Sequence, residues 1–348
     1  MGRIRFNNDY NRTAHPRVLE AILNSTADSY EGYGADEMCK IAEEKIRLLI
    51  KSQEASVYFF PGATQANYIV TTAALSPVQS VICADSGHIN CHEAASVEKS
   101  GHKIIALPNV NGKITAGQIE AEAQKYFLSG EAEYLTEPHM VYISFATEWG
   151  TLYSLDELTA ISEVCHKYGM LLFLDGARLG YGLMSDETDV TIEYLAHNCD
   201  AFYIGGTKVG ALFGEAVVFP RGNEPKHFYT MTKQHGAMLA KGWLTGLQFD
   251  VLFTDDLYFK IARNAIETEN AVKELIVKYN LKIMQLSPTN QQFVIVDNKL
   301  LAELNKEVAT DFWENADSEH TVIRFATSWY TTMDDVKKLD EILGRLVK

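Results

Sequence analysis

Apolar positions follow two alternating periods along most of the chain. Helical spacing predicts helices over residues 36–51, 63–75, 118–126, 155–168 and 190–197. Short apolar and β-branched runs predict strands over residues 55–60, 80–84, 103–107, 140–145, 170–175, 200–204 and 215–219. Several of these runs are apolar throughout, which is typical of strands buried on both faces. The alternation predicts an α/β fold with a mostly parallel sheet between helices, in which residues 217–219 fit an antiparallel strand.

The pattern changes after about residue 250. A long helical stretch over 257–279 is followed by strands near 281–285, 292–296 and 322–326, and Thr332 begins a last helix over 333–347. With 348 residues, the chain is roughly twice the usual size of one domain. We therefore predict a large domain over residues 1–250 and a smaller α+β domain over residues 251–348.

The net charge of −15 excludes two classes of partner. Nucleic acids and anionic membrane surfaces need clustered Lys and Arg, and the basic residues here are scattered. The five cysteines contain no CxxC pair, which favours reduced thiols. The start is too polar for a signal peptide, and no apolar run approaches the ~18 residues of a membrane span. We expect a cytoplasmic protein.

Three motifs with possible ligands do not fit their usual patterns. No GxGxxG follows the first predicted strand, and residues 205–210 lack the order of a P-loop. His88 and His92 are spaced as metal ligands on a helix would be, but no further ligand is evident. We expect neither a dinucleotide nor a metal ion.

Three other features follow predicted strands and together indicate one cofactor. Asp175 ends an apolar strand, Lys208 follows a strand and two glycines, and residues 61–64 form a small-residue turn before a helix. Alone, each is weak, because an Asp often caps a strand and a Gly-Lys turn is often an exposed loop. Together they match pyridoxal phosphate: a lysine to form the Schiff base, a carboxylate for the pyridine nitrogen and a helix N-terminus for the phosphate.

The motifs also resemble those of a known family, the low-specificity threonine aldolases among the fold-type I pyridoxal-phosphate enzymes. The resemblance covers nearly the whole chain, and the Asp-Gly-Ala-Arg and His-x3-His-Glu segments are its most specific parts. It rests on residues 8–9, 33–36, 62–67, 85–88, 174–178, 207–208 and 324–328. It implies a mostly parallel seven-stranded sheet between helices, a smaller C-terminal α+β domain, bound pyridoxal phosphate and a small amino-acid substrate.

The resemblance also implies roles for single residues. His88 would stack on the pyridine ring, Asp175 would pair with its nitrogen, and Lys208 would carry the cofactor. Arg178 and Arg324 would hold the substrate carboxylate, together with Asn8 at the position of a family serine. Arg178 would also lie against the cofactor, whose phosphate would meet Ala63, Thr64 and Thr207.

Three further residues match positions that the family places near a neighbouring subunit. Lys233 and Lys241 resemble basic residues contributed across the interface, although they fit ordinary solvated lysines as well. Tyr33 resembles a tyrosine at the mouth of the shared site, although an aromatic turn residue packed on its own domain is the plain alternative. The resemblance implies a homo-oligomer, a dimer of dimers with shared active sites.

The sequence departs from the family pattern after the strand near residue 143. The family carries Glu-Asn-Thr-His there, and its histidine approaches the β-hydroxyl group of the substrate. This chain has no histidine over 143–150, and Glu148 is the candidate base or polar anchor, or else a solvated turn residue.

We therefore predict a pyridoxal-phosphate lyase that cleaves a β-hydroxy-α-amino acid to glycine and an aldehyde. A β-eliminating lyase or an aminotransferase keeps the cofactor and is the first alternative. A non-catalytic relative is the second, and an intact set of Asp175, Arg178, Lys208 and Arg324 argues against it.

Overall fold

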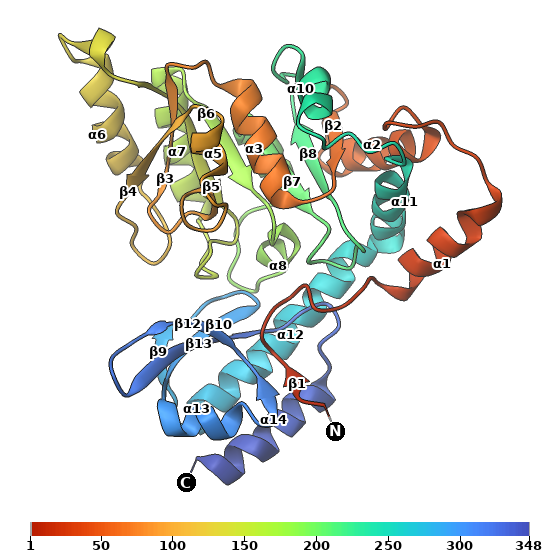
Figure 1. Cartoon of the computed structure of the whole chain (residues 1–348), viewed down its shortest axis with the longest axis vertical. Helices are drawn as coiled ribbons and strands as arrows, with labels where there is room; N and C mark the ends of the chain where they lie inside the picture. Colours follow the sequence, from red (N-terminus) through yellow and green to blue (C-terminus); the bar gives the residue numbers. More distant parts are fainter. Residues whose placement is uncertain (1, 348) are drawn as a thin grey trace.

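A seven-stranded sheet forms the centre of the larger part of the molecule (Figure 1). The computed structural model describes residues 2–347. The strand order is β2-β8-β7-β6-β5-β3-β4. The strands are β2 (Ser56–Phe60), β3 (Gln79–Ala84), β4 (Lys103–Leu107), β5 (Glu137–Ser144), β6 (Leu171–Asp175), β7 (Ala201–Gly205) and β8 (Glu215–Phe219). All seven predicted strands are present.

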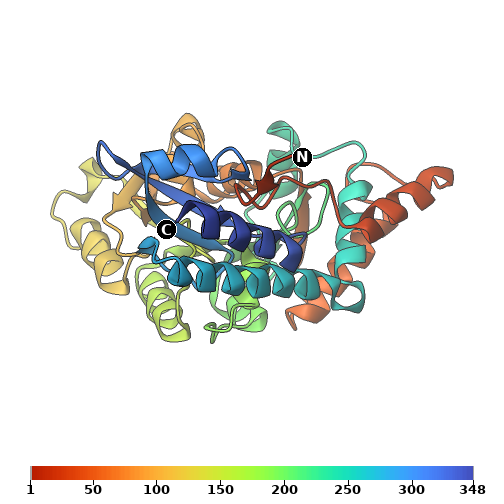
Figure 2. The same ribbon diagram turned by 90° about the horizontal axis from the view of Figure 1, so that it is seen from below.

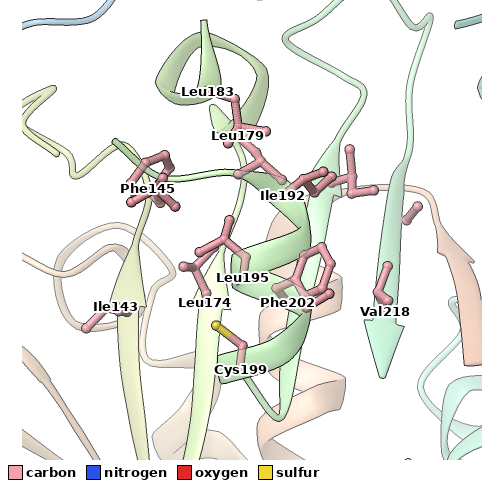
Figure 3. Packing of buried hydrophobic residues seen from close by; sticks show 14 of the residues in the cluster. Ile143, Phe145, Leu174, Leu179, Leu183, Ile192, Leu195, Cys199, Phe202 and Val218 are labelled. Atoms are coloured by element: carbon pink, nitrogen blue, oxygen red, sulfur yellow. The ribbon is translucent and has the colours of Figure 1, made fainter. Parts of the chain in front are cut away.

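β8 is antiparallel to both of its neighbours, β2 and β7, whereas the pairs from β7 to β4 are all parallel. The prediction of a mostly parallel sheet with one reversed strand near residue 217 is thus confirmed. The strands are buried on both faces because alternate side chains enter different apolar clusters. Leu174 and Phe202 pack in one cluster (Figure 3), and their neighbours Phe173 and Tyr203 pack in the other.

Helices cover both faces of this sheet. One face meets α3 (Ala63–Ala74), α5 (Ser96–Lys99) and α10 (Phe228–Gln234). The other meets α2 (Glu37–Leu49), α6 (Ala116–Phe127), α7 (Leu155–Tyr168), α8 (Leu179–Leu183), α9 (Ile192–Asn198) and α11 (Trp243–Leu252). Local signals fix several bounds: Ser154 caps α7 in a capping box with Glu157, and α7 ends where Gly169 adopts a left-handed conformation, with φ of 65°.

A second, antiparallel sheet has the order β12-β13-β10-β9. Its strands are β9 (Lys282–Gln285), β10 (Gln291–Asp297), β12 (Asp311–Asn315) and β13 (His320–Ala326). The helices α12 (Leu257–Lys278) and α14 (Met333–Leu346) lie side by side against it (Figure 2), and α13 (Asn298–Leu304) packs beside them. The sequence indicated α12, β9, β10, β13 and α14 but neither α13 nor β12.

The two ends of the chain meet in this second unit. Strand β1 (Ile4–Arg5) pairs in parallel with β11 (Val308–Ala309), so residues early in the chain lie against the C-terminal part. After β1 the chain passes between the two units and reaches α1 (Pro16–Asn24) beside α11. Helix α12 packs against α8 in the larger unit and α14 in the second. The proposed domain boundary near residue 250 stays a prediction.

No helix within residues 2–347 combines the length and the apolar character needed to cross a membrane. The 22-residue α12, for instance, has one face buried in the core and charged residues on the other. All five cysteines are free thiols, and Cys91 is the exposed one.

Candidate active site

A cavity of about 350 Å³ lies where the C-terminal ends of the central strands face the second unit. Its lining comes from the N-terminal segment, the larger unit and the second unit, namely Tyr10, His88, His92, Glu148, Arg178, Lys208, Asp311, Phe312, Trp313 and Arg324. A narrow inner extension of about 30 Å³ adds Ala63, Ser144, Ala146, Asp175, Ala177 and Tyr203. We call both together the Lys208 cavity. It brings together most of the residues that the sequence predicted for the site.

Asp175 lies at the inner end of the cavity, at the last residue of β6. Its carboxylate accepts hydrogen bonds from the Tyr142 hydroxyl (2.5 Å), the Asn67 amide (3.0 Å) and the Ala177 backbone N–H (2.9 Å). Burial by itself raises the pKa of Asp175, but the charge of His88 and these hydrogen bonds hold that pKa below its usual value. Asp175 is therefore a buried carboxylate that keeps its negative charge.

His88 begins the short helix α4 (His88–Cys91) and pairs with a buried carboxylate. Its Nδ1 lies 2.7 Å from Oε1 of Glu93, which also accepts from the Asn67 amide at 2.8 Å. Burial lowers the pKa of His88, but the hydrogen bond to Glu93 and the charge of Asp175 outweigh burial and raise that pKa. Nδ1 of His88 is thus occupied by Glu93, and the raised pKa favours the protonated ring.

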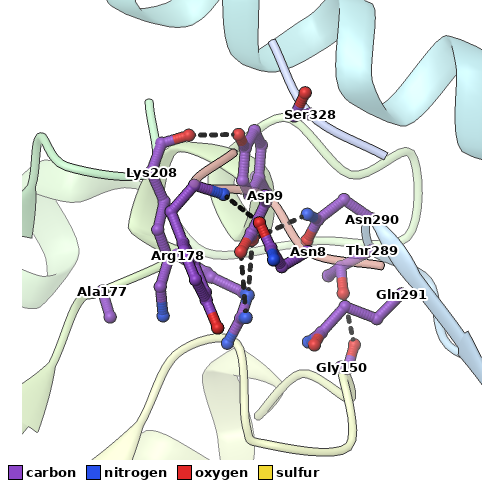
Figure 4. Close-up of polar contacts among 12 residues, drawn as sticks. Asn8, Asp9, Gly150, Ala177, Arg178, Lys208, Thr289, Asn290, Gln291 and Ser328 are labelled. Atoms are coloured by element: carbon purple, nitrogen blue, oxygen red, sulfur yellow. Dashed lines mark hydrogen bonds and ion pairs between the residues drawn. The ribbon is translucent and has the colours of Figure 1, made fainter. Parts of the chain in front are cut away.

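Lys208 follows β7, and its side chain lies near that of Arg178 (Figure 4) and lines the cavity together with Asp175. Burial and the nearby Arg178 lower its pKa to about 8. The backbone beneath it is tightly packed: a Cβ on Gly176 would lie 1.7 Å from the carbonyl oxygen of Tyr203. Only glycine fits between β6 and β7 there, which explains the Asp-Gly-Ala-Arg sequence. A lysine with a lowered pKa is a good amine nucleophile.

Arg178 is held by a carboxylate that the sequence did not single out. Its Nε and Nη2 donate to Oδ2 and Oδ1 of Asp9 at 2.7 and 3.1 Å, and the Asn290 amide donates to the same Oδ2 at 3.0 Å (Figure 4). Burial favours protonation of Asp9, but Arg178 and Lys208 hold the pKa of Asp9 well below its usual range. Asp9 thus ties the N-terminal segment to both units and fixes Arg178.

Arg324 reaches the cavity from β13 in the second unit. Its guanidinium donates to the Gln291 side-chain oxygen (2.7 Å) and to Asp311 Oδ2 (2.6 Å), and its centre lies 5.6 Å from the ring of Trp313. Burial and the like charge of Arg178 lower the pKa of Arg324. Two fixed guanidinium groups therefore face one cavity, an arrangement suited to a carboxylate ligand.

Glu148 lies in the loop after β5 and lines the cavity together with His88. Its Oε1 accepts hydrogen bonds from the backbone N–H of His88 (2.9 Å) and the hydroxyl of Ser144 (2.8 Å). Burial and the charge of Asp175 raise the pKa of Glu148. Glu148 does lie in a turn, but its side chain is hydrogen-bonded within the site rather than free in solvent.

The N-terminus of α3 is open toward the inner cavity. Its N-cap, Gly62, offers no side-chain oxygen to the first backbone N–H groups, and Ala63 at the first turn lines the inner extension. The Thr64 side also opens on a surface cavity of about 450 Å³ that includes Lys99. Across from α3, the hydroxyl of Thr207 accepts from the Gly214 N–H at 3.0 Å. Uncapped N–H groups of a 12-residue helix suit a phosphate.

These residues fit pyridoxal phosphate. The buried anion of Asp175 matches a protonated pyridine nitrogen, the amine of Lys208 matches the aldehyde, and the open end of α3 matches the phosphate. The side chains of Asn67 and Tyr203 each keep a buried oxygen without a hydrogen-bond partner among residues 2–347, beside Asp175.

Six residues predicted for the site do not line the Lys208 cavity: Thr64 and Thr207, described above, and Asn8, Tyr33, Lys233 and Lys241. Tyr33, Lys233 and Lys241 are exposed on a different part of the surface. The ammonium of Lys233 lies 4.2 Å from the centre of the Tyr33 ring, and the Tyr33 backbone N–H donates to Ala240, next to Lys241. We call Tyr33, Lys233 and Lys241 the Tyr33 patch. Asn8 lies beside Asp9, but its side-chain oxygen accepts from the Tyr10 N–H and it does not line the cavity.

Several residues of the site were given no role from the sequence, among them Asp9 and His92. Asp9 stands in residues 8–9, one of the segments that carry the family resemblance, and 169 positions separate it from Arg178. His92 was considered as a metal ligand and as part of the His-x3-His-Glu segment, without a role of its own, whereas the structure places it in the lining of the Lys208 cavity.

Comparisons with known proteins agree with this geometry. Residues 13–299 match the family model described as beta-eliminating lyase. A low-specificity L-threonine aldolase of Pseudomonas aeruginosa is 25% identical, over 93% of this chain and 92% of the relative. The structure of Leishmania major threonine aldolase has a TM-score of 0.96 at 36% identity, covering 99% of this chain and 100% of that one.

A Thermus thermophilus aspartate aminotransferase structure has a TM-score of 0.72 at 14% identity, which is a likeness of fold alone. It confirms the fold-type I architecture that the sequence resemblance implied. The relatives with higher identity, and the match of the family model to most of the chain, show the family of this chain as well as its fold. The chain belongs to the beta-eliminating lyase family and, within it, to the threonine aldolases, which makes it a pyridoxal-phosphate-dependent lyase.

Proposed function

We propose that this enzyme cleaves β-hydroxy-α-amino acids such as L-threonine into glycine and an aldehyde. The observation that carries the proposal is the convergence of Arg178 and Arg324 on the cavity that also contains Lys208. Two guanidinium groups bind the α-carboxylate of an amino acid, and Lys208 marks where its amino group reacts. The names of the relatives in the comparisons support the same reaction.

Substrate orientation comes from the two arginines. Arg178 is fixed by Asp9, and Arg324 is fixed by Gln291 and Asp311, so neither guanidinium has to be ordered when the carboxylate binds. A carboxylate held at two points sets the rotation about the bond to Cα. The two arginines would thereby hold the bond from Cα to Cβ in one orientation toward the bound cofactor.

Pyridoxal phosphate, when bound, supplies an aldehyde that condenses with amines and a ring that accepts the electron pair of the broken bond. Asp175 would keep a proton on the pyridine nitrogen, His88 would lie against the ring, and Lys208 would hold the aldehyde as a Schiff base. Ala63, Thr64 and Thr207 would bind the phosphate. The buried negative charge of Asp175 stabilises the positive charge of the ring nitrogen, which is the main electrostatic contribution of the protein.

Glu148 is proposed as a polar anchor of the reacting groups. It stands in the segment where the family resemblance leads us to expect a histidine, and it bonds the backbone of His88 rather than approaching the substrate from outside. Burial and the charge of Asp175 raise its pKa, which favours the protonated carboxyl more than in an exposed glutamate.

The Tyr33 patch is proposed as a contribution to the active site of a second copy of the chain. In one copy the patch and the Lys208 cavity share no lining residue, whereas the surface cavity beside Thr64 is open to a basic side chain from outside. A dimer of dimers with shared sites accounts for both features, and a cytoplasmic location fits the five free thiols.

Product analysis tests the proposed function. The purified holoenzyme is incubated with L-threonine, and separately with L-serine and with L-alanine plus an oxo acid. Glycine and acetaldehyde from threonine are expected, and a Lys208→Ala variant should release neither. Pyruvate from serine as the only product would indicate β-elimination instead. A new amino acid formed from the oxo acid would indicate transamination.

A further inference from the structure

Cleavage between Cα and Cβ needs a group that takes the proton of the β-hydroxyl, and the segment over 143–150 has no histidine to do so. Three other side chains of the Lys208 cavity are candidates by their chemistry: His88, Glu148 and His92. Their hydrogen bonds differ, and the difference decides between them.

His88 is a poor proton acceptor. Its Nδ1 is engaged by Glu93 at 2.7 Å, and its raised pKa favours the protonated ring, which has no free lone pair. Glu148 is also a poor choice, since its Oε1 already accepts from the His88 N–H and the Ser144 hydroxyl. The raised pKa of Glu148 favours the protonated carboxyl, which donates rather than accepts a proton.

His92 differs from both in position and in bonding. It follows the last residue of α4, lines the mouth of the cavity, and has its ring 5.5 Å from that of His88 and 6.5 Å from that of Trp313. Among residues 2–347 its ring nitrogens form no hydrogen bond, and the side chain is open to solvent from the cavity. A lone pair is therefore available on the side of the cavity that faces the second unit.

The distribution of charge around the cavity places the substrate between His92 and the arginines. Arg178 and Arg324 take the carboxylate and Lys208 marks the amino group, so the remaining substituent of Cα extends toward the part of the lining left over. That part includes His92, Phe312 and Trp313, and the ring of Trp313 lies 6.5 Å from that of His92; Tyr10 and Asp311 complete the lining. It matches a substituent with a hydroxyl at Cβ and an apolar group beyond.

We propose that His92 binds the β-hydroxyl group of the substrate and accepts its proton during cleavage, which makes His92 a catalytic residue of this enzyme. The inference rests on the proposed aldol cleavage. Phe312 and Trp313 form the surface for the rest of the side chain and favour substrates whose aldehyde product is apolar or aromatic.

The step balances in atoms and electrons. The O–H bond breaks and its proton moves to a ring nitrogen of His92, while the oxygen and Cβ form the carbonyl of the aldehyde. The bond between Cα and Cβ breaks, and its electron pair stays with the glycine fragment on the cofactor. The glycine fragment then takes up one proton at Cα, so no oxidant or reductant is needed.

The electrostatic surroundings of His92 support this role. Burial and the nearby positive charge of His88 lower the pKa of His92, with Arg324 and Lys208 acting in the same direction. Glu93 acts in the opposite direction, and Asp311 and Glu148 are the other carboxyl groups of the same lining. The neutral ring that a base requires is therefore the main form at pH 7.

The first test compares cleavage with a reaction that needs no β-hydroxyl. A His92→Phe variant keeps the size of the ring and removes both nitrogens, and we expect its kcat for L-threonine to fall about 100-fold. Exchange of the Cα protons of glycine with solvent should change less than threefold, because it uses Lys208 and Asp175 but not His92. In a His92→Ala variant, added imidazole should restore part of the threonine cleavage.

The second test measures binding rather than turnover. The dissociation constants of L-serine and L-alanine are determined from the absorbance change of the holoenzyme. The native enzyme should bind serine about fivefold more tightly than alanine through the hydroxyl, and His92→Phe should lose the difference. A Lys282→Ala variant, at an exposed lysine of β9 outside the cavity lining, should retain it.

The outcomes separate the two proposals. If the native enzyme releases no glycine from threonine, the proposed function fails and the role of His92 fails with it. If the native enzyme is active and His92→Phe retains its kcat and its preference for serine, only the role of His92 is overturned. Loss of glycine exchange along with cleavage would also overturn it, since His92 would then act on the cofactor site as a whole.

Discussion

The Lys208 cavity and the Tyr33 patch contain residues that the family resemblance assigns to one active site, yet they differ in almost every physical respect. In the cavity, Asp9 and Arg178 form a buried, two-point ion pair, and Asp175 accepts three hydrogen bonds. In the patch, the Lys233 ammonium lies 4.2 Å from the centre of an exposed Tyr33 ring. One region is fixed within a single chain, and the other is still open to a ligand or a partner.

The difference shows which interactions one chain can complete by itself. Buried charges are expensive without partners, so the groups of the cavity had to be paired during folding. Exposed lysines remain solvated without a partner, so they are free to bind an anion or a second copy of the chain. The following predictions test whether the two regions contribute as unequally as their packing suggests.

Replacement of Lys208 by alanine should have the largest effect. Without the amine, the holoenzyme should lose its visible absorbance and aldehyde release should fall at least about 1000-fold. The matched control is Lys282→Ala on β9, an exposed lysine of the second unit, which should leave both unchanged. If Lys208→Ala retained its turnover, the assignment of the active site to the Lys208 cavity would be contradicted.

Replacement of Asp9 by asparagine should be next. It leaves Arg178 buried without its anion, and we expect a loss of about 3 kcal/mol in the free energy of unfolding and about 100-fold in kcat/KM. Urea titration and steady-state kinetics measure the two effects.

Asp311→Asn provides the comparison within the same cavity. Asp311 pairs with Arg324 at 2.6 Å but its side chain is 39% exposed, so the loss should stay below about 1 kcal/mol and tenfold in kcat/KM. If Asp9→Asn and Asp311→Asn had equal effects, the distinction between a buried partner of Arg178 and a half-exposed partner of Arg324 would be contradicted.

The rate of cofactor uptake should depend on pH through Lys208. Its amine reacts only when neutral, and its pKa is lowered to about 8, so the rate should rise roughly tenfold between pH 7 and pH 9. Arg178→Gln removes a positive charge that lowers this pKa and should move the rise to higher pH. A native midpoint near 10.5 would place the reactive lysine outside the charged cavity. Absorbance stopped-flow of the apoenzyme with pyridoxal phosphate measures the profile.

Replacement of Lys233 by alanine should have the smallest effect. We expect the dissociation constant of pyridoxal phosphate to increase about fivefold, corresponding to about 1 kcal/mol, with little change in kcat at saturating cofactor. The increase should disappear at protein concentrations low enough to dissociate the oligomer. An unchanged constant at all concentrations would make the Tyr33 patch an ordinary solvated surface.

Much of this architecture follows from local patterns. The apolar runs identify every strand of the central sheet, and the same runs locate Asp175 and the strand before Lys208 because each ends at a polar residue. Capping residues such as Ser154 and Thr332 set helix starts within one or two positions. The edge of the sheet where the site lies could be predicted for that reason.

The contacts that complete the site depend on distant parts of the chain. Strand β1 has two residues, which is too short to show a hydrophobic period. Its pairing with β11 nevertheless fixes the start of the segment that contains Asp9. The position of His92 depends on where α4 ends and on the neighbouring strand β12. The sequence of β12 does not indicate a strand, because Phe312 is exposed and charged residues lie beside it. Such placements come from packing between the two units rather than from local sequence.

Reduction of the holoenzyme with sodium borohydride tests the central claim most directly, because it fixes the cofactor to the lysine that holds it. Proteolysis and mass spectrometry then identify the modified residue. We predict that the pyridoxyl group is found on Lys208 alone, and that prior incubation with glycine protects this lysine. Modification of Lys233 or Lys241 in place of Lys208 would contradict the account, since it would move the active site from the Lys208 cavity to the Tyr33 patch.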